Sequence, residues 1–172
     1  MSIFQRLQAE AKQYENIVGK FYEHHTIYEL IDEGDKIVKD YDCLLIDEIN
    51  EKRKTIEVKV NAGSDKYGSP YQTCCVELTE WEKPSHWLTA PFDLMCYYNR
   101  YDDSLHFYKG QVIRDWAEQN KGRARWATHN RTTNITMPWI CKESGHLVSF
   151  KIDTETYNVI ETYLEEGEYY VK

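Results

Sequence analysis

Apolar residues recur at helical spacing over the first part of the chain. Steps of three or four residues between them predict an amphipathic helix from about residue 3 to residue 24. Ser2 followed three residues later by Gln5 matches a capping box, which marks the start of this helix. The pattern also allows the helix to resume through Tyr28, Leu30 and Ile31 and to stop at Gly34. The apolar positions are Phe4, Leu7, Ala11, Tyr14, Val18 and Phe21.

The next two segments have the pattern of a β-hairpin. Residues 43–46 form a short continuous apolar run, which is typical of a strand buried on both faces. Residues 50–53 form a polar turn, and residues 55–60 then alternate between apolar and polar side chains. In a strand this alternation places Ile56, Val58 and Val60 on one face and Glu57, Lys59 and Asn61 on the other.

The rest of the chain predicts more strands and helices. Thr89 as an N-cap and Pro91 early in the segment indicate a helix over 89–101. The whole order indicates one α/β or α+β domain over residues 1–172, with a mixed central sheet flanked by helices. The other expected elements are a loop at 62–70, strands at 72–81, 105–108 and 147–152, helices at 111–120 and 154–164, and one or two strands within 123–142.

Composition is that of a folded domain, with 41% hydrophobic and 14% aromatic residues. No apolar stretch approaches the roughly 20 residues of a membrane span, so no membrane partner is expected. The N-terminal residues lack the basic and apolar regions of a signal peptide, which favours a cytoplasmic location. The five cysteines form no CxxC pair and are expected to be reduced, buried side chains.

A net charge of -8 argues against binding a polyanion through bulk charge. A nucleic-acid partner would need a local basic surface, and residues 121–131 are the candidate because they contain four cations and no acid. One interpretation is phosphate contact with Trp126 stacking on an unpaired base, and the other is a solvated loop. The candidate contacts are Lys121, Arg123, Arg125, Trp126 and Arg131.

The hairpin carries the candidate chemistry. Asp42 precedes the first strand, and Glu57 and Lys59 share one face of the second. Because paired strands lie about 4.8 Å apart, the two carboxylates can meet and hold a hard cation such as Mg²⁺. A bound cation activates water and neutralises phosphate charge, and a lysine can position the water. The alternative is an ordinary surface ion pair between Glu57 and Lys59.

Two other acids compete with Asp42 for the first ligand position. Asp47 lies at the far end of the apolar run, beside the turn, and Asp40 shares the face of Asp42 only if the strand begins early. No phosphate-binding loop, dinucleotide fingerprint or HExxH motif occurs in the sequence.

This arrangement resembles the PD-(D/E)xK nuclease superfamily, whose core order is helix, three strands, helix, strand. The resemblance covers about residues 5–110 and leaves 111–172 as a C-terminal extension; Tyr41 stands where the proline would be. It implies a restriction endonuclease-like core, a DNA substrate and a Mg²⁺ or Mn²⁺ cofactor. It also implies that Asp42, Glu57 and the backbone carbonyl of Val58 are metal ligands and that Lys59 is the catalytic lysine. Glu15, with Glu23 as runner-up, would be the acid that some members add from the first helix.

A second resemblance is to uncharacterised phage and bacterial members, which follow E-x-K with a strand ending in an acid and a helix opening with Thr and Asp. Here these would be Glu77, Thr89 and Asp93. A phage-encoded chain would act in the host cytoplasm. The sequence leaves three functions open: an active deoxyribonuclease, a weak or inactive relative that binds nucleic acid or protein, and an unrelated α+β protein. It also leaves open a homodimer.

Overall fold

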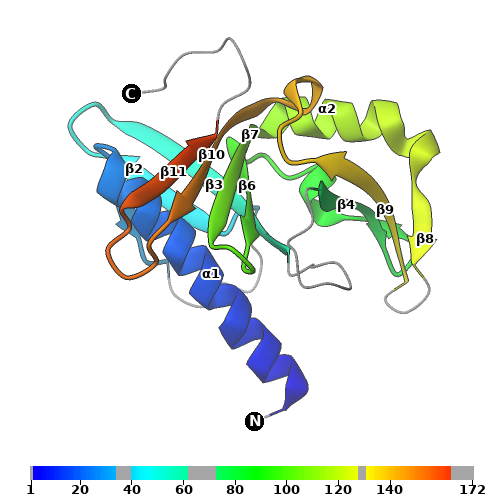
Figure 1. Cartoon of the computed structure of the whole chain (residues 1–172), viewed down its shortest axis with the longest axis horizontal. Coiled ribbons are helices and arrows are strands. Elements are labelled where there is room, and N and C mark those ends of the chain that lie inside the picture. Colours follow the sequence, from blue (N-terminus) through cyan, green and yellow to red (C-terminus); the bar gives the residue numbers. More distant parts are fainter. Residues whose placement is uncertain (1, 34–39, 62–72, 128–130, 164–172) are drawn as a thin grey trace.

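The computed structural model describes residues 2–33, 40–61, 73–127 and 131–163. Within these residues the fold is α+β, with two α-helices, a seven-stranded mixed sheet and a four-stranded antiparallel sheet (Figure 1). The described helices include none with the length and apolar character needed to cross a membrane. The predicted loop at 62–70 and the predicted stop at Gly34 lie outside the described residues, as do the side chains of Phe4 and Leu7.

The seven-stranded sheet has the order β1-β2-β3-β6-β7-β10-β11. Its strands β3 and β6 run parallel, and every other neighbouring pair in it is antiparallel. Helix α1 (Ile3–His25) covers one face of it, burying Val18 and Phe21 in a first core, and begins with the predicted Ser2–Gln5 capping box. The strands are β1 (Glu29–Ile31), β2 (Cys43–Asp47), β3 (Lys52–Asn61), β6 (Leu94–Asn99), β7 (Ser104–Lys109), β10 (His146–Ile152) and β11 (Val159–Tyr163).

The small sheet has the order β5-β4-β9-β8 and lies beside the other face. Helix α2 (Gly110–Asn120) extends from the seven-stranded sheet towards β8 (Figure 1). It buries Ile113 and Trp116 in a second core, together with Val76 and Ile135 of the small sheet. The strands are β4 (Thr73–Glu80), β5 (Lys83–Pro84), β8 (Arg125–Ala127) and β9 (Thr132–Pro138), and short 3₁₀ turns are η1 (His86–Leu88), η2 (Lys121–Arg123) and η3 (Lys142–Ser144).

Three predicted helical segments are wrong. Residues 29–31 form β1, the segment 89–101 contains β6, and residues 159–163 form β11. Strand β6 is buried on both faces between β3 and β7, so its continuous apolar run imitates the buried stripe of a helix. Strand β11 is rich in β-branched and aromatic residues and pairs with β10 across a turn that Asp153 caps. The predicted hairpin, first helix and helix at 111–120 are confirmed.

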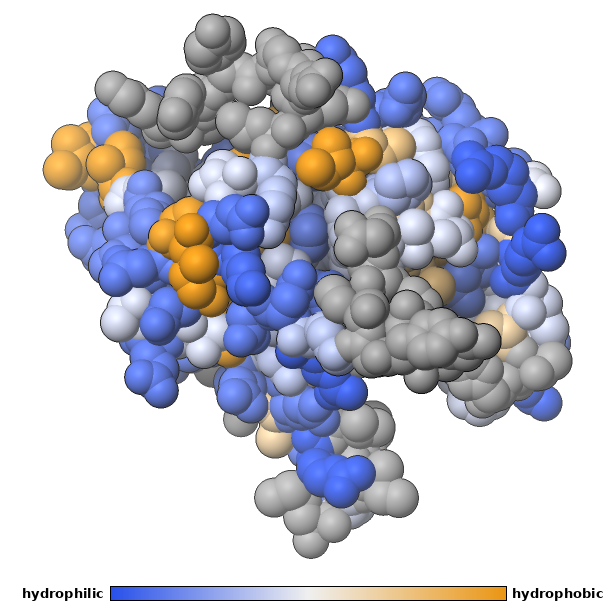
Figure 2. Space-filling view, viewed as in Figure 1, coloured by the Kyte–Doolittle hydropathy of each residue, from blue (hydrophilic) through white to orange (hydrophobic). Residues whose placement is uncertain are grey.

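The described residues form no extended apolar patch on the face that Figure 2 shows. Apolar residues form separate islands among hydrophilic ones there. Scattered exposed apolar side chains are normal for a folded domain and do not by themselves indicate a docking surface.

Candidate metal centre

Asp42 is fixed to strand β3 by two hydrogen bonds. Its backbone N–H donates to the carbonyl of Ile56 at 2.9 Å, and its carboxylate Oδ2 accepts the backbone N–H of Val58 at 2.7 Å. The last paired residue of β2 at this end is Cys43, opposite Ile56. The Asp42 carboxylate therefore bonds the Val58 N–H beyond the point where β2 stops pairing. Because the N–H and C=O of one strand residue point to the same side, the Val58 carbonyl is also directed to this side of β3.

Glu57 and Lys59 lie together on one face of β3. The Lys59 Nζ is 2.7 Å from the Glu57 Oε1, and their side chains are 37% and 12% exposed, respectively. On the opposite face Ile56 and Val58 are buried in the first core, under α1. The alternation predicted for residues 56–59 is therefore confirmed, whereas Val60 is 38% exposed and the side chain of Asn61 lies outside the described residues. This alternation directs the two charged side chains to the face beside the small sheet.

The two carboxylates repel each other. Burial, and then the negative charge of Glu57, raise the pKa of Asp42 to about 7, although the Val58 N–H and Lys59 act in the opposite direction. Burial acts to lower the pKa of Lys59, but the charge and hydrogen bond of Glu57, followed by Asp42 and Glu77, raise it overall. The lysine is therefore held as an ammonium ion among three acids, and the carboxylates gain from a cation.

The donor set fits a hard divalent cation. It consists of two carboxylates and one backbone carbonyl, all oxygen atoms, which are the ligands that Mg²⁺ and Mn²⁺ prefer. Among the described residues no three His, Cys, Asp or Glu side chains converge to form a metal site. Mg²⁺ is commonly held by only one or two protein carboxylates, with water and phosphate oxygens in the other positions.

The two candidate acids of helix α1 contribute less directly to the metal centre. Glu15 of α1 is close enough to raise the pKa of Asp42 further, and its backbone carbonyl accepts the Cys43 thiol at 3.2 Å. Glu23, the runner-up, pairs with Lys20 at 3.0 Å and accepts the backbone N–H of Leu30. Glu23 therefore has a structural role in joining α1 to β1.

The competing acids have other partners. The Asp47 carboxylate accepts the backbone N–H groups of Ile49 and Asn50, so it caps the hairpin turn. Asp40 lies 3.3 Å from the His86 ring nitrogen. Asp42, which directly precedes β2, is thus the acid that lies beside Glu57.

A pocket of about 240 Å³ separates Lys59 from the small sheet. Glu77 of β4 is held on its rim because its carboxylate accepts the Ser85 hydroxyl at 2.7 Å and its carbonyl accepts the Trp87 indole N–H at 2.8 Å. Sequence reasoning did not find Asn134, although the alternation of Asn134 and Thr136 with the buried Ile135 and Met137 is a strand signal. The lining residues are Lys59, Val60, Cys75, Glu77, Trp87, Tyr97 and Asn134.

The five residues of the basic segment differ in their surroundings. Lys121 pairs with Glu118, and Arg123 donates to the Asn120 side chain at 3.1 Å. Trp126 is 46% exposed on β8, the edge strand of the small sheet. The Arg131 guanidinium lies 5.2 Å from the ring centre of Trp81. Arg125 begins β8 and is exposed.

Thr89 and Asp93 have structural roles and do not mark the start of a helix. The Thr89 hydroxyl donates to the His86 carbonyl, which closes the η1 turn. The Asp93 carboxylate accepts the backbone N–H of Thr55 at 2.8 Å and its hydroxyl at 3.1 Å. Asp93 therefore clamps the start of β6 to β3, the strand that carries Glu57.

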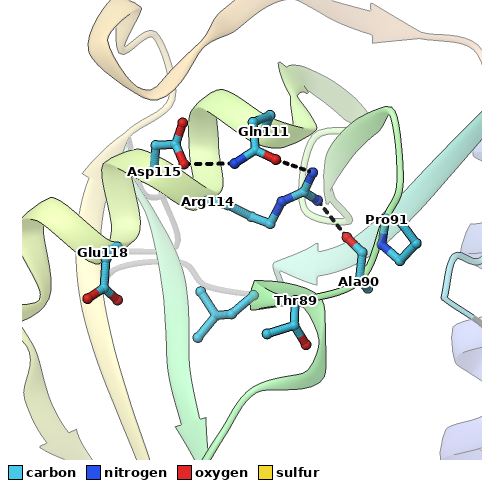
Figure 3. A pocket seen from close by; sticks show the side chains of 8 residues that line it. Thr89, Ala90, Pro91, Gln111, Arg114, Asp115 and Glu118 are labelled. Carbon is cyan, nitrogen blue, oxygen red and sulfur yellow. Dashed lines mark hydrogen bonds between the residues drawn. The ribbon is translucent and has the colours of Figure 1, made fainter.

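A second pocket, of about 380 Å³, lies between α2 and the segment 88–91 (Figure 3). Arg114 is its central cation, but its guanidinium donates to the Ala90 carbonyl at 2.7 Å and to the Gln111 side chain at 3.2 Å. Figure 3 shows Gln111 also bonded to Asp115. These bonds tie α2 to the loop, so we assign this pocket a structural role.

No protein-family model matches the chain, and neither a curated protein nor a solved structure matches it with significant similarity. Functional interpretation therefore depends on the site itself.

Proposed function

We propose that this protein is a metal-dependent nuclease that hydrolyses DNA phosphodiester bonds. The observation that carries the proposal is the junction of β2 and β3. There the Asp42 carboxylate binds the β3 backbone beside Glu57, and Lys59 lies 2.7 Å from Glu57. Two crowded carboxylates with an adjacent ammonium ion suit a cation, a phosphate and a water molecule.

Each residue has a role in this proposal. Asp42, Glu57 and the Val58 carbonyl would hold Mg²⁺ or Mn²⁺, which when bound lowers the pKa of water and neutralises phosphate charge. Lys59 binds a phosphate oxygen or orients the attacking water, because its side chain is partly exposed beside Glu57 and lines the pocket. The bond from Val58 orients Asp42 before any ligand arrives.

The strand arrangement supports the superfamily resemblance in part. Helix α1 is followed by three consecutive paired strands, β1, β2 and β3, and then by β6 beside β3. The segment 73–92, with β4 and η1, stands where the superfamily order has its second helix. The proposal therefore depends on the site more than on the topology.

A cleavage assay tests the proposal. We expect plasmid or oligonucleotide cleavage with Mg²⁺ or Mn²⁺ that Glu57→Ala and Lys59→Ala each reduce by at least about 100-fold. Glu48→Ala and Lys83→Ala, at exposed positions, are the matched controls and should keep wild-type rates. Circular dichroism should show that all four variants remain folded. Wild-type cleavage rates in both site variants would contradict the proposal.

A second candidate function is nucleic-acid or protein binding without catalysis. The net charge of -8 and the Glu57–Lys59 ion pair favour it, because both oppose the approach of a phosphate. Titration of Mg²⁺ by calorimetry separates the two functions. Saturable binding that Asp42→Asn weakens supports the nuclease, since a binding module has no need to retain a metal site.

A further inference from the structure

The polar face of the small sheet contains a row of three side chains. Glu77 of β4 lies opposite Asn134 of β9, and Asn134 lies opposite Arg125 of β8. Directly opposed residues on neighbouring strands project to the same face of a sheet. Glu77 and Asn134 line the pocket that contains Lys59. The row therefore leads from the candidate metal centre to the edge strand β8.

Among the cations of the basic segment, Arg125 is the one whose guanidinium has no ion-pair, hydrogen-bond or cation–π partner within the described part of the chain. Lys121 pairs with Glu118, Arg123 bonds to Asn120, and Arg131 lies over Trp81. Arg125 is exposed, and no acid of the described residues lies within ion-pair distance of it. On an acidic protein, such a charge is the natural contact for a phosphate.

The spacing of the row matches a nucleic-acid strand. Two strand intervals of about 4.8 Å place Arg125 about 10 Å from Glu77. Successive nucleotides of a stacked strand are about 3.4 Å apart, so this interval spans about three nucleotides. Glu77 repels phosphate but accepts hydrogen bonds from base amino groups, and the amide of Asn134 can both donate and accept. The bases, not the backbone, are suited to this middle part of the row.

We propose that a DNA strand crosses this face from the phosphate at Lys59 and that Arg125 binds a further phosphate, about three nucleotides beyond the position of Glu77. This inference rests on the proposed nuclease function and identifies how its substrate is held. Glu77 and Asn134 contact the intervening base edges. Lys121, Arg123 and Arg131 lie outside the path.

Matched charge variants test the path. In a Lys59→Ala background, which should not cleave, the binding of a fluorescent single-stranded 12-mer is measured over a salt series with Arg125→Ala or Arg123→Ala added. Each added substitution removes one exposed positive charge. We expect Arg125→Ala to weaken binding about tenfold and to make the negative slope of log K against log salt shallower by about 0.7, as for one lost phosphate contact. Arg123→Ala should change the affinity less than about twofold and leave the slope unchanged.

Two further results distinguish this inference from the proposed function. In the cleaving protein, Arg125→Ala should raise KM about tenfold and leave kcat unchanged, because the contact is remote from the reacting atoms. Equal affinities and slopes for the two arginine variants would overturn the path even if cleavage depends on Glu57. If the wild-type protein does not cleave DNA, the nuclease proposal fails, and the binding comparison still decides the role of Arg125.

Discussion

Asp42 occupies a position that is unfavourable for its own charge. Its carboxylate is largely buried beside Glu57, and both effects favour the protonated form. The Val58 N–H compensates for only part of this cost. A neutral side chain of the same shape should therefore suit the metal-free protein better than the native residue does.

We expect Asp42→Asn to raise the free energy of unfolding of the metal-free protein at pH 8 by about 1 kcal/mol or more, because the amide oxygen can still accept the Val58 N–H without repelling Glu57. Urea denaturation with a chelator present measures the change. Glu48→Gln, which removes one negative charge from the exposed hairpin turn, is the control and should have little effect. A lower stability of Asp42→Asn than of the control would contradict the crowding of charge at this site.

At the scale of single residues, the sequence predicts the members of the candidate metal centre better than the residues that line the adjoining pocket. Asp42, Glu57 and Lys59 follow from the alternation on one hairpin, where local pairing decides which side chains meet. Tyr97 and Asn134 reach the same pocket from strands distant in sequence, the first predicted as a helix and the second only as part of one or two strands within 123–142. Their convergence depends on how the two sheets pack, which no local pattern records.

Among the elements, β7 and β10 are joined by a buried polar network. Ser149 of β10 lies within hydrogen-bond distance of the Nδ1 of His106, at 2.7 Å, and of the Nε2 of His146, at 2.8 Å. Burial lowers the pKa of His106 to about 3 and that of His146 to about 4. Both rings are therefore neutral in the folded protein at neutral pH, whereas an unfolded chain binds a proton at each below about pH 6.5.

This difference in proton binding predicts that the folded protein loses stability in acid. Because the unfolded state binds more protons, stability should fall as the pH drops below about 6.5, by up to about 1.4 kcal/mol per pH unit for each histidine, and should stop falling below the folded pKa values. Chemical denaturation from pH 7 to pH 4.5 measures the slope. His146→Gln should make it shallower, whereas His24→Gln, at an exposed position, should not. Equal slopes in both variants would show that His146 does not cause the loss.

Element by element, the sequence predicts the amphipathic structures and the short buried strands β2 and β7 well, but it predicts the buried strand β6 as a helix. Helix α1 and strand β3 have a polar and an apolar side, which gives each a readable period. Strand β6 has no polar side, because β3 and β7 flank it and a core lies on each face. Its Cys96, Tyr97 and Tyr98 favour a strand by residue type, but the N-cap signal at Thr89 points the other way.

On the scale of the whole molecule, β6 and β7 connect two cores. Met95 and Tyr108 belong to the core beneath the small sheet, while Cys96 and Phe107 belong to the core beneath α1. Loss of either strand would expose both cores. The protein should therefore unfold in one cooperative transition even though it contains two sheets.

The tryptophans make this prediction measurable. Three of the five, Trp87, Trp116 and Trp139, lie in the core beneath the small sheet, and none lies in the core beneath α1. Tryptophan fluorescence thus follows the core beneath the small sheet. Far-ultraviolet circular dichroism is dominated by the helices, and helix α1 covers the other core. We expect the same urea midpoint from both signals. Separate midpoints would mean that the small sheet and α2 unfold independently.

The pocket beside Lys59 also contains a chemical handle. Of the five cysteines, Cys75 is exposed, Cys141 is partly exposed, and Cys43, Cys74 and Cys96 are buried. Burial raises the pKa of the Cys74 and Cys96 thiols, so they resist alkylation at neutral pH. A maleimide dye should attach first at Cys75, which lines the pocket with Lys59 and Glu77. The native chain thus offers, without an engineered cysteine, an attachment point in this pocket for an environment-sensitive fluorophore, whose signal can follow the arrival of an oligonucleotide in real time.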